Sequence, residues 1–122
     1  MYGFREQEIA SALDLARSHR FVDDHRFAGY FIEERIRRGW GPRKIEAELK
    51  LKGIDISSIE GYPERFFPDG REFELALDVL RRKRIPDTKA FERLVRHLLN
   101  RGFDGSVARR AVSLILEAHE EA

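Results

Sequence analysis

A glycine followed by an aromatic residue occurs three times in this chain, and a similar apolar spacing follows each pair. In two copies, apolar residues stand five and nine residues after the aromatic residue, and in the third copy the spacing is one residue shorter. The copies are Gly3-Phe4 with Ile9 and Leu13, Gly39-Trp40 with Ile45 and Leu49, and Gly102-Phe103 with Val107 and Ala111. Apolar residues four positions apart share one face of a helix. The repetition therefore predicts an array of helical units that bury their apolar faces against one another.

Apolar residues recur at intervals of three and four through most of the sequence, a pattern typical of amphipathic helices. No segment alternates apolar and polar residues for long enough to predict a strand. We therefore expect an all-α fold in which tandem three-helix repeats form an elongated, curved array. The expected helices cover residues 6–18, 24–38, 42–52, 71–83, 88–100 and 104–119.

The glycine-aromatic pairs also suggest how the helices are grouped into units. Residues 1–20 are expected to be the last helix of a first repeat whose other helices are missing. Residues 21–84 form the second repeat, with a loop near residues 54–70 that contains two prolines and two glycines. Residues 85–122 form the third repeat.

The composition excludes several classes of protein. Apolar residues make up 42% of the chain and charged residues 37%, which fits a helix-rich globular protein. There is no cysteine and no apolar run of membrane-spanning length, so we expect a cytoplasmic protein that contacts no membrane. The four histidines show no pairing four residues apart, and no glycine-rich phosphate loop occurs. We therefore expect neither an enzyme nor a protein with a metal or other cofactor.

The charge is unevenly distributed although the net charge is only +1. Seven Lys or Arg against two acidic residues lie between residues 35 and 52, and eight against two lie between residues 81 and 101. Basic clusters in a nearly neutral chain indicate an anionic partner. Because equivalent positions of stacked repeats line one surface, we expect a basic track across the second and third repeats. Its residues are Arg35, Arg38, Arg43, Lys44, Arg93, Arg101, Arg109 and Arg110.

Arg43 and Arg101 are expected to be among the cations most available to an external anion. Neither has an acidic residue at the helical spacing that favours ion pairs, and neither belongs to an apolar stripe. Reversing both charges is therefore expected to weaken binding without disturbing the fold.

Trp40 has two interpretations. It either packs between helices, as its equivalence to Phe103 favours, or offers a stacking surface to a ligand.

Three stretches of the sequence carry a resemblance to a known family. They are Phe21-Val22-Asp23-Asp24-His25-Arg26-Phe27-Ala28, then Arg37-Arg38-Gly39-Trp40-Gly41-Pro42-Arg43-Lys44-Ile45 with Leu49, Lys52, Gly53 and Ile54, and Leu98-Leu99-Asn100-Arg101-Gly102-Phe103 with Val107 and Arg110. Together they strongly resemble the RecX family, and the Arg-Gly-Trp-Gly-Pro block is the most specific part. The resemblance covers most of residues 2–116.

The resemblance implies a regulator of the bacterial RecA recombinase. RecX-like proteins are built from tandem three-helix repeats that lie in the groove of the RecA–DNA filament, and they commonly inhibit strand exchange and ATP hydrolysis. The resemblance therefore implies that this chain binds RecA or the RecA–single-stranded DNA filament and modulates homologous recombination, DNA repair and the SOS response. Two alternatives remain open at the level of the residues: a helical-repeat protein that binds DNA directly, and a plain protein-interaction scaffold. Whether the chain is a monomer or a dimer also remains open.

Overall fold

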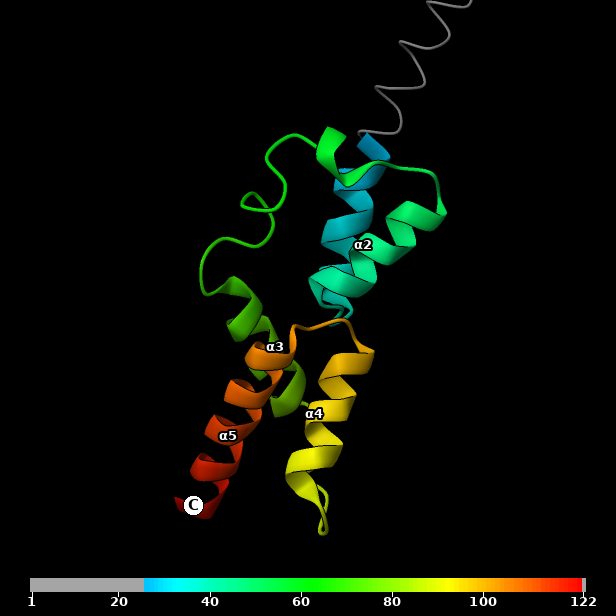
Figure 1. Cartoon of the computed structure of the whole chain (residues 1–122). Coiled ribbons are helices and arrows are strands. Elements are labelled where there is room, and N and C mark those ends of the chain that lie inside the picture. The colour runs from blue at the N-terminus through cyan, green and yellow to red at the C-terminus, as the bar shows by residue number, and fades with distance from the viewer. Residues whose placement is uncertain (1–25, 122) are drawn as a thin grey trace, which may run out of the picture.

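The computed structural model describes residues 26–121, and the expected first-repeat remnant over residues 1–20 lies outside them. The described part consists of helices and turns, with no strand among its residues, which confirms the all-α prediction (Figure 1). The chain is helical over residues 26–37. The helices that follow are α2 (Pro42–Leu51), the short 3₁₀ helix η1 (Ile56–Ser58), α3 (Arg71–Arg81), α4 (Ala90–Asn100) and α5 (Gly105–Glu121).

Both described glycine-aromatic pairs end a helix in the same way. Gly39 and Gly102 adopt left-handed backbone angles, with φ of 85° and 96°. The amides of Trp40 and Phe103 then donate to the carbonyls five residues earlier, at 3.0 and 3.1 Å. This is the Schellman helix ending, in which a glycine takes the left-handed position and an apolar residue follows it. The repeated sequence feature is therefore a repeated signal for ending a helix and turning the chain.

The buried side chains form two separate hydrophobic clusters, which divide the described residues into two units. The upper unit comprises the helix over residues 26–37, α2, η1 and the turns up to Phe67. The lower unit comprises α3, α4 and α5, which pack against one another. Figure 1 shows the upper unit stacked on the lower one in an elongated arrangement.

The grouping of α3 differs from the sequence prediction. We expected this helix to belong with the helices before it, in a repeat over residues 21–84, but its buried residues Ala76, Leu77 and Leu80 lie in the lower cluster. The place of a third helix in the upper unit is taken by the segment after α2, whose Ile59 and Phe66 are 5% exposed. An apolar stripe shows which face of a helix is buried, but not which neighbour covers it. The region near residues 54–70 is thus part of a core as well as a connection.

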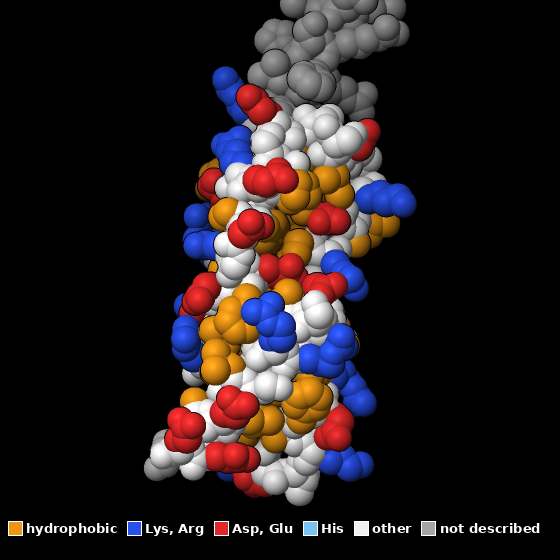
Figure 2. All heavy atoms as spheres, turned by 60° about the vertical axis from the view of Figure 1, so that its left-hand side comes forward, with side chains coloured by type: hydrophobic (Ala, Val, Ile, Leu, Met, Phe, Trp, Pro, Cys, Tyr) orange, Lys and Arg blue, Asp and Glu red, His pale blue; other side chains and the backbone are white. Residues whose placement is uncertain are grey.

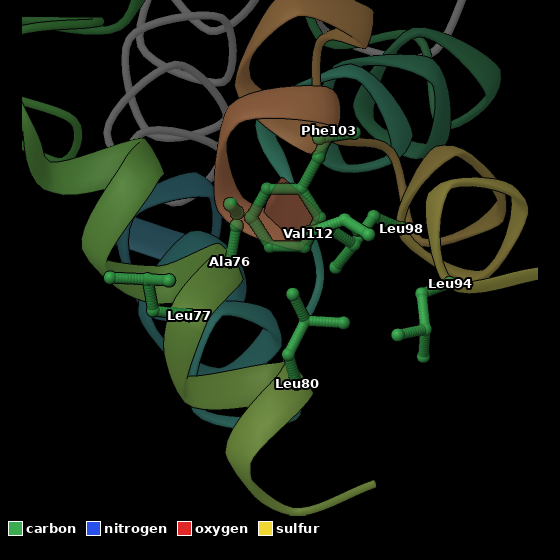
Figure 3. Packing of buried hydrophobic residues seen from close by; sticks show 9 residues of the cluster. Ala76, Leu77, Leu80, Leu94, Leu98, Phe103 and Val112 are labelled. Atoms are coloured by element: carbon green, nitrogen blue, oxygen red, sulfur yellow. The ribbon is translucent and has the colours of Figure 1, made fainter. Parts of the chain in front are cut away.

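Phe103 lies at the top of the lower core. Its side chain is 1% exposed and points between α3, α4 and α5, where Ala76, Leu98 and Val112 surround it (Figure 3). Because the ring directly follows the helix ending at Gly102, the turn between α4 and α5 is anchored in the core.

The two units meet where their two helix endings touch, which we call the junction (residues 38–44 against residues 101–104). The amide of Gly41 donates to the carbonyl of Arg101 at 2.6 Å, and the amide of Arg43 donates to the carbonyl of Gly102 at 2.9 Å. A Cβ atom on Gly41 would lie 2.5 Å from the backbone of Gly102, and one on Gly102 would lie 2.4 Å from the amide nitrogen of Lys44. The junction therefore requires glycine at both positions.

We expect Gly102→Ala to destabilise the protein far more than Gly53→Ala. Both glycines have positive φ, but a Cβ on Gly53 would meet nothing within 4 Å. Gly53→Ala should therefore lose only about 1–2 kcal/mol for the left-handed conformation. Gly102→Ala adds a clash with backbone and should lose more than about 4 kcal/mol in urea unfolding. Equal losses would show that the close approach of the two backbones is not a constraint.

Candidate functional site

Asp104 connects three helices at the junction. Its carboxylate accepts hydrogen bonds from the amide and hydroxyl of Ser106 at 3.0 and 2.5 Å, and so caps the start of α5. The same carboxylate forms an ion pair with Arg43 of α2, at 2.6 Å. Its amide donates to the carboxylate of Glu72 in α3, at 2.8 Å. Asp104 thus links α2 of the upper unit to α3 and α5 of the lower unit.

Arg101 crosses the junction in the opposite direction. Its Nη1 donates to the carbonyl oxygen of Arg38 at 2.9 Å, and its Nε donates to Nε2 of His97 at 3.3 Å. The half-buried guanidinium therefore ties the end of α4 to the end of the helix over residues 26–37.

These contacts correct two expectations for Arg43 and Arg101. We expected both residues to be among the cations most available to an external anion, and their charge reversal to leave the fold intact. The structure shows instead that each bonds across the junction, to Asp104 and to Arg38. The partners stand 61 and 63 residues away in the sequence, so a search for ion pairs within one helix cannot find them.

Trp40 lies against the upper core between two cations. It is half-buried, its ring meets that of Phe31 edge-on at a centroid distance of 6.5 Å, and it packs against the upper cluster. The guanidinium of Arg35 lies 5.0 Å from the ring centroid and the ammonium of Lys44 lies 4.2 Å from it. Arg35 also pairs with Glu34 and lies over the ring of Phe31 at 4.4 Å. The geometry favours the packing interpretation of Trp40, with cation–π contacts on the ring.

The other residues of the predicted track lie away from the junction. Arg93 stands in the first turn of α4, about 12 Å along the helix from Arg101 at a rise of 1.5 Å per residue. Arg109 and Arg110 line a shallow hollow beside Phe73, and Arg110 lies 4.7 Å from that ring. On the face drawn in Figure 2, side chains of both charge signs are interspersed with apolar ones. The predicted residues therefore form a group at the junction and separate positions beyond it.

The junction also contains a basic pocket that extends beyond the residues of the predicted track. A hollow of about 340 Å³ is lined by Arg38, Gly39, Val79, Arg82, Lys83, His97 and Arg101. Arg82, Lys83 and His97 were not part of the predicted track. The sequence signal that could have revealed them is that basic residues stand at the ends of three helices, around residues 38, 82 and 101.

The described residues show neither a metal site nor a membrane span. No three of their His, Asp and Glu side chains come together in a way that could hold a metal ion. None of the helices within residues 26–121 has both the length and the apolar character needed to cross a bilayer.

Comparison with known proteins places the chain in a family. The family model described as "RecX, second three-helix domain" matches residues 23–60. A protein of Thermus thermophilus named "Regulatory protein RecX" is 40% identical over 117 residues, which cover 96% of this chain and 77% of that protein. A protein of Vibrio vulnificus with the same name is 33% identical over 116 residues, which cover 91% of this chain and 74% of that protein. The chain belongs to the RecX family.

The RecX match agrees with the packing of the upper unit. The matched domain ends at residue 60, before α3 begins at Arg71. Some RecX relatives are much longer than this chain. The alignment to "Regulatory protein RecX" of Caldanaerobacter subterraneus, at 27% identity over 112 residues, covers 92% of the chain but only 56% of that relative.

We expect Trp40→Ala to destabilise this RecX chain by about 2 kcal/mol, because only part of the ring is buried. Phe103→Ala is the matched reference and should lose about 3–5 kcal/mol, since its ring is 1% exposed. Thermal and urea unfolding measure both values. Unchanged stability in Trp40→Ala together with lost partner binding would instead support the stacking interpretation.

We also expect Asp104 to contribute to the loss of stability in acid. The hydrogen bond from the Ser106 hydroxyl is the largest cause that holds the pKa of Asp104 below its usual 3.8. Burial opposes it, but the amides of Ser106 and Val107 and the charge of Arg43 lower the pKa further. A carboxyl with a lowered pKa stabilises the fold above its unfolded pKa and loses this contribution as the pH falls through the folded pKa. Urea unfolding from about pH 5 down to about pH 2 should therefore show a smaller decrease for Asp104→Asn than for the parent. Equal decreases would contradict this assignment.

Proposed function

We propose that this chain binds RecA or the RecA–single-stranded DNA filament and inhibits strand exchange and ATP hydrolysis, as a regulator of recombination and DNA repair. The observation that supports the proposal is that the chain belongs to the RecX family, and its relatives in Thermus thermophilus and Vibrio vulnificus are named regulatory proteins. The stacked units fit the extended surface that a filament groove requires (Figure 1). No catalytic step by the chain itself belongs to this proposal.

The accessible basic residues are the proposed contacts to the filament. Arg93 and Arg109 are exposed, and neither has an ion pair or hydrogen bond among the described side chains. Arg110 is exposed beside Phe73, and Lys44 stays half-exposed over Trp40. Cations without partners in the chain can approach phosphates or acidic groups at little structural cost.

The test measures binding of the purified chain to bare single-stranded DNA, to RecA alone and to the assembled filament, each at two salt concentrations. We expect selective binding to the filament and a decrease in its DNA-dependent ATP hydrolysis. Equal binding to bare DNA would favour the alternative of a direct DNA-binding protein, and binding to none of the three would contradict both.

A matched pair of double variants tests the proposed contacts. Arg93→Glu with Arg109→Glu should weaken filament binding by at least tenfold. The control, Arg84→Glu with Arg96→Glu, makes the same change in charge at exposed residues of the lower unit outside the proposed contacts. It should weaken binding much less. If both variants bind like the parent, the basic residues do not contact the filament.

A further inference from the structure

The pocket at the junction collects cations from three helix ends. Arg38 follows the helix over residues 26–37, Arg82 and Lys83 follow α3, and Arg101 follows α4. Four of the seven residues that line this hollow of about 340 Å³ are Lys or Arg, and none is acidic. The cations reach the hollow from separate elements, so they surround it on several sides.

The positive charge of the pocket is larger than the negative charge of the three helix ends and the one nearby carboxylate. Each helix end carries about half a negative charge, or roughly 1.5 for the three. Glu34 pairs with Arg38 at 2.6 Å outside the lining. The four positive charges of the lining exceed the sum of these negative charges. A compact anion in the hollow would balance the remainder.

Arg101 is held in place with donors to spare. A guanidinium has five N–H donors, and two of those on Arg101 are used, by the carbonyl of Arg38 and by His97. These bonds fix the plane of the group, which reduces the entropy lost when a ligand binds to its other donors. Arg82 and Lys83 are exposed at the rim of the same hollow.

We propose that the junction pocket binds a phosphate group, which is supplied either by a DNA backbone or by a free phosphate. Phosphate oxygens accept hydrogen bonds from several directions at once, as cations around a hollow require. The proposal is independent of RecA, because it concerns only groups within this chain.

His97 reports on the occupancy of the pocket. Burial, together with the charges of Lys83 and Arg101, lowers the pKa of His97 below its usual 6.5. The charged groups that face it are Arg38 from the upper unit, Arg82 and Lys83 from α3 and Arg101 from α4. An anion in the pocket would offset these cations, so its binding raises the pKa of His97. The imidazole signal, identified by its loss in His97→Gln, gives this pKa by NMR titration of the full chain.

The titration is run with no ligand, with inorganic phosphate and with a short oligothymidylate. If the pKa of His97 rises in the presence of each ligand, the site accepts free phosphate as well as a DNA backbone. If it rises only in the presence of oligothymidylate, the DNA backbone is the source of the bound phosphate. A pKa that stays unchanged with both ligands would overturn the proposal. The cations would then serve only to stabilise the helix ends.

Binding measurements with matched variants locate the site. Arg82→Gln with Lys83→Gln removes two cations of the pocket rim, and Arg84→Gln with Arg96→Gln removes two exposed cations outside its lining. We expect the first pair to weaken oligothymidylate binding at least tenfold and the second pair less than threefold. Equal losses would indicate unspecific attraction and refute the site. An oligoglutamate peptide of equal charge that binds as tightly and shifts His97 equally would also refute a preference for phosphate.

Discussion

The structure depends on the direct approach of two backbone turns at the junction. Gly41 and Gly102 lack side chains where a Cβ atom would lie within about 2.5 Å of the opposite backbone, so the amides of Gly41 and Arg43 reach carbonyls of the other unit. Each turn is itself the end of a helix, fixed by a glycine with positive φ and anchored by the aromatic residue that follows. The same short sequence therefore ends a helix, anchors it to a core and supplies the surface on which the next unit stacks.

This arrangement decides what the neighbouring charges do. Arg43 and Arg101 stand beside the touching turns, and both hold the units together, through Asp104 and through the carbonyl of Arg38. Their positive charge remains at the junction, but some of their donors are occupied. The cations that stay available include those at the rim of the basic pocket and the exposed ones on α4 and α5. A basic residue in this chain must therefore be judged by its contacts rather than by its position in a repeat.

The sequence predicted the helices well, because their limits are set by local signals. The helices expected over residues 42–52 and 71–83 are observed over Pro42–Leu51 and Arg71–Arg81. Gly41 and Gly53 flank the first helix, and Gly70 precedes the second. The partners of each helix depend on contacts between distant residues, which local patterns do not contain. For that reason the sequence pattern groups α3 with the helices before it, whereas its buried residues lie in the lower cluster. The pattern also gives no sign of the ion pair between Arg43 and Asp104. The pocket was missed for the same reason, since its cations come from three elements that are far apart in the sequence.

The position of the pocket follows from how the units are joined. Three helices end near the junction, and unpaired carbonyls at helix ends favour basic residues in the last turn and just beyond it. Stacking brings these ends together, so cations that each stabilise a separate helix come to surround one hollow. Their mutual repulsion is then relieved most by an anion that several of them can contact at once. A site of this kind can arise from the stacking of units alone, without a binding motif in any single helix.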